Sequence, residues 1–262
     1  DGRTDLSIFR PSEGNWYLNR STDGSSVVSW GLSADIQTPG DFDGDNKADA
    51  AIFRPSTGTW WILRSSGGVS STAFGASGDV PVVGDYNGDG TSDIALFRPS
   101  NNTWYIQHTG GGTLTASFGA AGDLPVRGDY NGDGSTDIAI YRPSTGAWWI
   151  ANSGGVTATT FGLSTDKPVP ADYDGDNKDD IAVFRPSTGT WYILRSTNAA
   201  VDIVTFGVAT DVPVPGDYDG DGKDDQAIYR DGTWWLNRST SGVIAAAFGL
   251  STDRPIPAKY IP

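Results

Sequence analysis

The 262-residue sequence contains no cysteine and no methionine, and His108 is its only histidine. Without cysteine, the chain cannot form a disulfide framework, a thiolate metal site or a cysteine nucleophile. No apolar run approaches the roughly 20 residues of a membrane-spanning helix, and the N-terminus has no signal-peptide pattern. We therefore expect a soluble chain with no membrane insertion. Because Asp1 lies inside a repeated motif, we also expect the chain to be a processed or trimmed piece.

Glutamate is nearly absent as well, since Glu13 is the only one among 32 acidic residues. These acids outnumber the 18 Lys and Arg residues and give a net charge of −14. An acid excess made of Asp, in clusters with Gly and Asn, favours oxygen-ligand metal loops over a merely solubilising surface. Because phosphate binding needs clustered Lys and Arg, we expect no nucleic-acid partner.

The chain is built from a repeat. An aromatic residue followed by Arg recurs with a period of 43 to 45 residues, ending apolar runs at residues 8–10, 52–54, 96–98, 140–142, 183–185 and 228–230. Each copy also has an aromatic strand, a strand ending in an aromatic-Gly pair, and a Pro-rich strand before an Asp-rich loop. Four short strands in about 44 residues are typical of a propeller blade. The sequence predicts an all-β fold, a six-bladed β-propeller forming a single domain over residues 1–262.

The two ends of the chain each hold part of one blade. Residues 254–260 match residues 212–218, which are a Pro-rich strand and the start of a loop, whereas residues 1–5 match the loop end at 221–225. We therefore expect residues 251–262 to complete the blade begun by residues 1–34. Pairing of the N- and C-terminal segments leaves no exposed sheet edge.

Five Asp-rich loops share the frame Asp-x-(Asp/Asn)-x-Asp-(Gly/Asn)-x-x-Asp. Oxygen-bearing side chains recur at loop positions 1, 3, 5 and 9, and the backbone carbonyl at position 7 adds a further ligand. This spacing lets short side chains converge on one Ca²⁺, which takes roughly 6 to 8 oxygen ligands. The predicted metal-binding residues are Asp41, Asp43, Asp45, Lys47 and Asp49; Asp85, Asn87, Asp89, Thr91 and Asp93; Asp129, Asn131, Asp133, Ser135 and Asp137; Asp172, Asp174, Asp176, Lys178 and Asp180; and Asp217, Asp219, Asp221, Lys223 and Asp225.

The same loops could be plain polar turns, because Asp and Gly are also common turn residues. Five copies in phase favour the metal interpretation, and position 6 is always Gly or Asn, the residues that tolerate a left-handed backbone. We expect about five structural Ca²⁺ ions, one per loop. A sixth loop, assembled from the two chain ends, has Lys259 at position 1 and Ile261 at position 3, and we predict that it binds no calcium.

The Phe-Gly pairs and the segment Gly216–Asp225, which reads GDYDGDGKDD, resemble the FG-GAP/VCBS repeats of integrin α-subunit propellers and many bacterial secreted proteins. The resemblance covers nearly the whole chain. It implies a propeller fold, Ca²⁺ in the loop between the first two strands of each blade, and an extracellular setting. Functions in that family include adhesion, fungal sugar binding and non-catalytic domains attached to enzymes, so the resemblance does not choose among them.

Each aromatic strand begins with a Trp that could stack on a sugar ring, so the candidate ligand-binding residues are Trp16, Trp60, Trp104, Trp148, Trp191 and Trp234. A large side chain repeated once per blade is also the wedge expected between neighbouring sheets, and we favour packing. The repeated Arg residues could bind an acidic ligand. We favour structural ion pairs, because a repeated Asp accompanies them at Asp35, Asp79, Asp123, Asp166, Asp211 and Asp253.

Little in the sequence indicates catalysis. We expect His108 to be a solvated strand end, and no Ser has the context of a nucleophile elbow. A glycosidase needs two carboxylates free of metal, and the acids outside the loops are mostly the repeated structural Asp. We therefore expect no enzyme.

Structural calcium favours folding where Ca²⁺ is about 10⁻⁴ to 10⁻³ M, as it is outside cells. We expect an extracellular or cell-surface recognition or adhesion module, with a glycan or a protein as its ligand. The alternatives are a structural or surface-assembly propeller with no small ligand, and a polysaccharide-active enzyme or an accessory domain of one.

Overall fold

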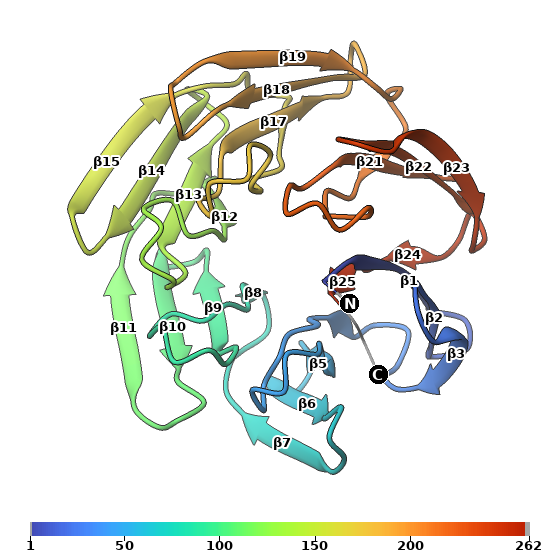
Figure 1. The fold of residues 1–262 in the computed structure, drawn as a ribbon. Helices are drawn as coiled ribbons and strands as arrows, with labels where there is room; N and C mark the ends of the chain where they lie inside the picture. The colour runs from blue at the N-terminus through green and yellow to red at the C-terminus, as the bar shows by residue number, and fades with distance from the viewer. Residues whose placement is uncertain (1, 260–262) are drawn as a thin grey trace.

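The computed structural model describes residues 2–259, and these residues form 25 β-strands and no helix. The strands make six antiparallel sheets that stand around one axis (Figure 1). Five sheets have four strands in sequential order from the axis outward; in the sixth, the innermost strand comes from near the C-terminal end, the next three are the first strands of the chain, and an extra short strand also pairs with the first of these. The predicted six-bladed β-propeller is confirmed.

In each blade a short innermost strand is followed by three longer ones. From the axis outward, blade 1 has β24 (Arg254–Pro255), β1 (Thr4–Arg10), β2 (Asn15–Arg20) and β3 (Gly24–Ser29); blade 2 has β4 (Ile36–Gln37), β5 (Ala50–Arg54), β6 (Thr59–Leu63) and β7 (Val69–Ala73); blade 3 has β8 (Val80–Pro81), β9 (Ile94–Arg98), β10 (Thr103–Gln107) and β11 (Thr113–Ser117); blade 4 has β12 (Leu124–Val126), β13 (Ile138–Arg142), β14 (Ala147–Asn152) and β15 (Gly155–Thr160); blade 5 has β16 (Lys167–Pro168), β17 (Ile181–Arg185), β18 (Thr190–Leu194) and β19 (Val201–Thr205); and blade 6 has β20 (Val212–Pro213), β21 (Gln226–Arg230), β22 (Thr233–Arg238) and β23 (Gly242–Ala247).

Burial along the strands explains their composition. The second strand of a blade is buried on both faces, as in β5, where the first four residues are all buried. Such a strand is a continuous apolar run because neighbouring blades cover both of its faces. The outermost strand, such as β7, alternates between exposed and half-buried residues and is correspondingly polar. The core therefore lies between the blades.

Ring closure joins the two ends of the chain. Residues Ile8 and Phe9 of β1 pair with β24, and Thr4 and Asp5 pair with β25 (Ala258–Lys259). The backbone N–H of Ile256 also donates to the carbonyl of Ser7, at 2.8 Å. The predicted closure by the terminal segments is thus confirmed for the described residues, whereas residues 1 and 260–262 of the closing segments lie outside them.

The six Trp residues that begin the aromatic strands have no exposed surface, each being 0% exposed. In blade 2, the Trp60 ring lies 5.3 Å from the Phe53 ring, and its indole N–H donates to the carbonyl of Phe74. The same indole bond recurs in every blade. The packing interpretation of these residues is therefore right. Their candidate role as ligand-binding platforms is wrong, because a fully buried ring cannot stack on a sugar.

The repeated Arg and Asp residues form one bidentate ion pair in each blade, as predicted. In blade 5, Arg185 donates from Nε and Nη2 to the two oxygens of Asp166, at 2.9 and 2.8 Å. In blade 1 the pair joins Arg10 to Asp253 from opposite ends of the chain, which also secures the closure. All six Asp residues are buried. The pairs tie the connection that enters each blade to the end of its second strand.

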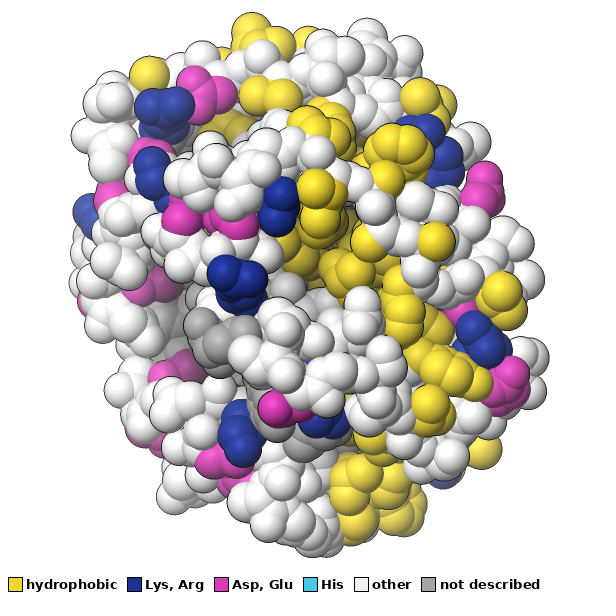
Figure 2. Space-filling model, turned by 45° about the vertical axis from the view of Figure 1, so that its right-hand side comes forward, with side chains coloured by type: hydrophobic (Ala, Val, Ile, Leu, Met, Phe, Trp, Pro, Cys, Tyr) yellow, Lys and Arg dark blue, Asp and Glu magenta, His cyan; other side chains and the backbone are white. Residues whose placement is uncertain are grey.

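The surface carries both hydrophobic and charged side chains. In Figure 2 hydrophobic side chains gather in a band through the middle of the view, while charged side chains are scattered around it. Within the described part of the chain, no helix is long and apolar enough to cross a membrane.

Candidate metal centre

Each Asp-rich loop connects the innermost strand of a blade to its second strand. The base of the loop is closed by pairing of position 9 with the residue before position 1, for example Asp49 with Gly40. At position 6, Asn46 and Asn177 have a φ of 64°, and the three glycines at this position also have positive φ. The predicted left-handed turn is confirmed. Because every loop joins the same two strands of its blade, all five loops lie at the same end of the ring.

The position-1 carboxylate holds the loop backbone together. In the loop at 41–49, Asp41 Oδ1 accepts from the N–H of Gly44 at 2.6 Å, and Oδ2 accepts from the N–H of Asn46 at 2.8 Å. The other four loops repeat both bonds. The residue at position 7 donates its backbone N–H to the position-5 carboxylate in each of the five loops. These bonds fold the loop backbone around the carboxylates at positions 1 and 5.

The position-9 carboxylates are buried, with exposed fractions of 0 to 4%. Asp49 accepts the backbone N–H of Phe42 at 2.9 Å and that of Ser65 at 2.7 Å. Burial disfavours the charged form of these carboxylates, and it is the largest cause that raises the pKa of Asp137, Asp180 and Asp225 to about 6. A cation beside such a carboxylate would favour its charged form and relieve this cost.

In three loops the carboxylates converge on one point. Ligand atoms lie within 4.8 Å of one another in the groups Asp41, Asp43 and Asp45; Asp172, Asp174 and Asp180; and Asp217, Asp219 and Asp225. At position 3 of these loops, the Oδ1 atom is buried and has no hydrogen-bond partner among the described residues. A buried carboxylate oxygen without a partner is costly, and a cation bound beside these atoms would relieve that cost.

In the other two loops position 3 is Asn, and its amide is satisfied within the loop. Asn131 Nδ2 donates to Asp133 Oδ2 at 3.0 Å, and its Oδ1 accepts from the N–H of Asp133 at 2.8 Å. Asn87 makes the same two bonds with Asp89, at 3.0 and 3.2 Å. These loops therefore contain no unpartnered oxygen at position 3.

Hydroxyl groups of a neighbouring turn were missed by the sequence analysis. The turn between the third and fourth strands of blade 5 reaches the loop, where Ser196 Oγ donates to Asp176 Oδ2 at 2.9 Å and Thr197 Oγ1 donates to Asp174 Oδ2 at 2.6 Å. Blade 6 repeats this arrangement with Ser239 and Thr240. Partners of this kind orient metal ligands. Their signal in the sequence is a Ser or Thr pair after the third strand.

Neighbouring loops are linked around the ring. In each of five links, the N–H at position 8 of one loop, or of Thr4, donates to the carbonyl at position 1 of the loop before it, as from Ser92 to Asp41 and from Asp179 to Asp129. The stem of Lys178, at position 7, lies against Gly132 of the preceding loop. The loops thus overlap in one direction rather than standing apart.

His108 is not the solvated strand end that was expected. Its side chain is only 17% exposed, and Nδ1 lies 2.9 Å from Oδ2 of the position-9 residue Asp93. The expectation was wrong because the turn that follows β10 folds over the loop, which brings position 108 to the buried carboxylate.

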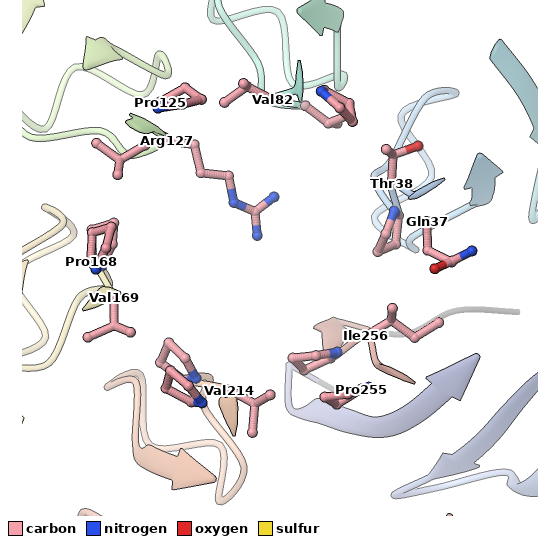
Figure 3. Close-up of a pocket in the computed structure, with 18 of the residues that line it drawn as sticks. Gln37, Thr38, Val82, Pro125, Arg127, Pro168, Val169, Val214, Pro255 and Ile256 are labelled. Atoms are coloured by element: carbon pink, nitrogen blue, oxygen red, sulfur yellow. The ribbon is translucent and has the colours of Figure 1, made fainter. Parts of the chain in front are cut away.

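A channel runs along the ring axis, with a volume of about 670 Å³. Mostly Pro, Val and Ile side chains from all six blades line it, together with Gln37, Thr38 and Lys167 (Figure 3). Arg127 extends farthest into the open centre, where the equivalent positions hold Pro or Val. Its guanidinium makes no hydrogen bond or ion pair with the described residues. This residue breaks the repeat and adds a charge to a channel that Lys167, Gln37 and Thr38 also line.

The donor set of the Asp-rich loops fits Ca²⁺. Oxygen is the only ligand atom that these side chains offer, several carboxylates meet in one turn, and three loops carry unpartnered oxygens. Hard cations prefer this kind of site. Of the sixth loop, Ile261 lies outside the described residues, so its predicted lack of calcium stays a prediction.

Residues 41–96 and 129–183 match the family model described as FG-GAP-like repeat. A search of curated proteins found no match.

Solved structures show the same architecture at low sequence identity. The chain resembles an Agrocybe aegerita lectin described as recognising non-reducing terminal N-acetylglucosamine (TM-score 0.60, 14% identity, 94% of this chain and 77% of that one). It also resembles virginiamycin B lyase from Staphylococcus aureus (TM-score 0.56, 10% identity, covering 96% and 87%). A third match is BBS1N in complex with ARL6DN (TM-score 0.60, 11% identity, covering 99% and 88%). At these identities, the likeness shows the fold alone.

Proposed function

Because the chain is a six-bladed β-propeller with FG-GAP-like repeats, we propose that it is a calcium-stabilised, non-catalytic recognition module that works outside the cell. The observation that carries the calcium role is the unpartnered Oδ1 atom at position 3 of three loops, on Asp43, Asp174 and Asp219. Each is buried among carboxylates that belong to the same turn. A bound Ca²⁺ would satisfy these atoms and neutralise the cluster.

The role of the ion is structural. It would fix the turn between the first two strands of a blade, and the overlapping loops would spread this effect to the neighbouring blades. Folding would then depend on calcium at the concentrations found outside cells. This dependence supports an extracellular or cell-surface location.

The recognition role rests on the ring. Its axial channel has walls rich in Pro and Val, and Gln37, Thr38 and the guanidinium of Arg127 are polar contacts for a ligand. We propose a glycan or a partner protein as the ligand. The lectin and the BBS1N complex in the comparisons illustrate both uses of the fold in other proteins.

Calcium is tested by thermal unfolding of the chain in excess EDTA and then in excess Ca²⁺, with bound metal counted on the same sample. An ion held at 100 times its Kd adds about 2.7 kcal/mol to the free energy of unfolding, so several ions should raise the Tm clearly. No shift and no bound metal would mean that the loops are only turns. The extracellular proposal would then fail as well.

Recognition is tested on a glycan array with the calcium-loaded chain and the variant Arg127→Val. Val83 occupies the equivalent position in blade 3, so the variant copies a side chain that the repeat already accepts. Binding that the variant loses would support the channel as the recognition site. If no glycan binds, a structural or surface-assembly role becomes the better explanation.

A further inference from the structure

The five Asp-rich loops fall into two classes. In three loops, Asp at position 3 faces a hydroxyl in the turn between the third and fourth strands, in the pairs Asp43 with Ser66, Asp174 with Thr197, and Asp219 with Thr240. In the other two loops position 3 is Asn, and the same turn position is Gly, in the pairs Asn87 with Gly110 and Asn131 with Gly154. Across the five repeats, the charge and the hydroxyl occur together or not at all.

The hydroxyl determines which oxygen is left for a metal. Thr240 Oγ1 donates to Asp219 Oδ2 at 2.8 Å, and Ser241 N donates to the same oxygen at 2.9 Å. Oδ2 is thereby saturated and the carboxylate is fixed, while Oδ1 stays buried without a partner. A ligand held in place before the ion arrives loses little conformational entropy on binding.

The two loops with Asn at position 3, at residues 85–93 and 129–137, lack a position-3 carboxylate fixed in this way. Asn131 Oδ1 already accepts the N–H of Asp133, which leaves it one lone pair for an ion, and its Nδ2 occupies the Asp133 carboxylate. The loop at 85–93 has a further competitor, because His108 Nδ1 lies 2.9 Å from Asp93 Oδ2. At positions 1, 3, 5 and 9 these two loops supply three carboxylates, whereas the three loops with Asp at position 3 supply four. Calcium affinity in such loops is tuned by the number of charged ligands and by rigidity.

We infer that the five loops are not equivalent: those at 41–49, 172–180 and 217–225 bind Ca²⁺ tightly, and those at 85–93 and 129–137 bind it about tenfold or more weakly. The inference rests on the proposed calcium binding and divides its sites into three and two. Position 3 and its turn partner set the class.

The test is calorimetric titration of EDTA-stripped full-length chain with CaCl₂, together with metal counting after desalting. The expected isotherm has three tight sites followed by two weaker ones, with three ions retained after desalting. Five equal sites, or five ions retained, would overturn the inference while leaving the calcium proposal intact. A flat isotherm with no bound metal would overturn the calcium proposal itself.

A gain-of-function variant tests whether position 3 and its turn partner determine how tightly a loop binds Ca²⁺. The double change Asn131→Asp with Gly154→Ser should convert the loop at 129–137, which has no histidine against its position-9 carboxylate, giving four tight sites and one weak site. The backbone of Gly154 is not left-handed, and a Cβ there would lie 3.3 Å from Asn152 Oδ1, the end of a side chain that can shift, so a serine fits. The control Asn101→Asp adds the same charge at the exposed turn between β9 and β10 and should leave three tight sites.

The reverse change is Asp43→Asn with Ser66→Gly, which should leave two tight sites and three weak ones. Because the two changes lie in one loop and one turn of blade 2, the other four loops report whether the ring is still folded. If either variant leaves the number of tight sites at three, position 3 and its partner do not set the class, and the inference fails.

Discussion

The six Arg-Asp pairs are expected to be among the largest polar contributions to stability, and Arg185 of blade 5 allows a sharp test. Its guanidinium is 19% exposed, the Asp166 side chain is 0% exposed, and two bonds under 3 Å join them. It also lies 4.2 Å from the centre of the Tyr192 ring. After Arg185→Ala, the buried carboxylate would keep the N–H of Leu163 at 2.9 Å.

The magnitude follows from these contacts. Breaking a buried pair costs about 3–5 kcal/mol, and loss of the aromatic contact adds about 0.5–1 kcal/mol. Partial exposure of the guanidinium and the remaining N–H reduce the total, so we expect a loss of about 3 kcal/mol in the free energy of unfolding.

Urea unfolding at saturating Ca²⁺ measures this loss, and the same blade contains a control. Arg195 pairs with Asp202, but these side chains are 40% and 35% exposed. Because exposed pairs contribute little, Arg195→Ala should cost less than about 1 kcal/mol. Equal losses for the two variants would refute the argument that burial of the carboxylate sets the cost.

Three further predictions concern packing, closure and backbone conformation, each measured by urea unfolding. Trp104→Ala should cost about 3–5 kcal/mol because the ring is fully buried, whereas Trp235→Ala, 38% exposed, should cost less than about 1 kcal/mol. Ile256→Ala should cost about 2–4 kcal/mol and speed amide exchange in β1 while leaving blade 4 protected; uniform exchange would contradict local closure. Gly189→Ala should cost more than about 2 kcal/mol, because φ is +62° and a Cβ would lie 2.1 Å from the carbonyl oxygen of Gly207, whereas Gly78→Ala, at φ +90° with open space, should cost about 1 kcal/mol.

The architecture was predictable because each of its rules repeats six times. The period, the aromatic-Arg pairs and the matching chain ends indicate blade number, ion pairing and closure without any knowledge of tertiary contacts. One copy of Phe184-Arg185 would have indicated only a strand end. Repetition at equivalent positions is what connects Arg185 with Asp166.

Contacts between turns were harder to predict from the sequence. Asp174 and Thr197 are 23 residues apart, and nothing in either segment alone shows that the two turns meet. The co-occurrence of Asp with a hydroxyl and of Asn with Gly across the five repeats carries this information, and it becomes readable once the contact is known. His108 shows the same limit, because its environment depends on a loop that comes earlier in the chain.

Burial of the aromatic strand illustrates a different limit. Successive residues of a strand face opposite sides, so Trp60 and Trp61 must lie on different faces of the sheet. The pattern does not show which of the two faces is covered by other blades, because both residues are large and aromatic. The structure shows that Trp60, which packs against Phe53, is the fully buried residue of the two.

The links between neighbouring loops would make the proposed ion sites a one-dimensional array with nearest-neighbour coupling. The N–H of Asp224 donates to the carbonyl of Asp172, so the loops at 172–180 and 217–225 share a structural element. Occupancy of one should therefore change the affinity of the other, and by linkage the effect must be reciprocal. The loop at 41–49 is joined to neither, so it should respond less. Calcium titration of this ring would then report position around the circle as well as ligand chemistry.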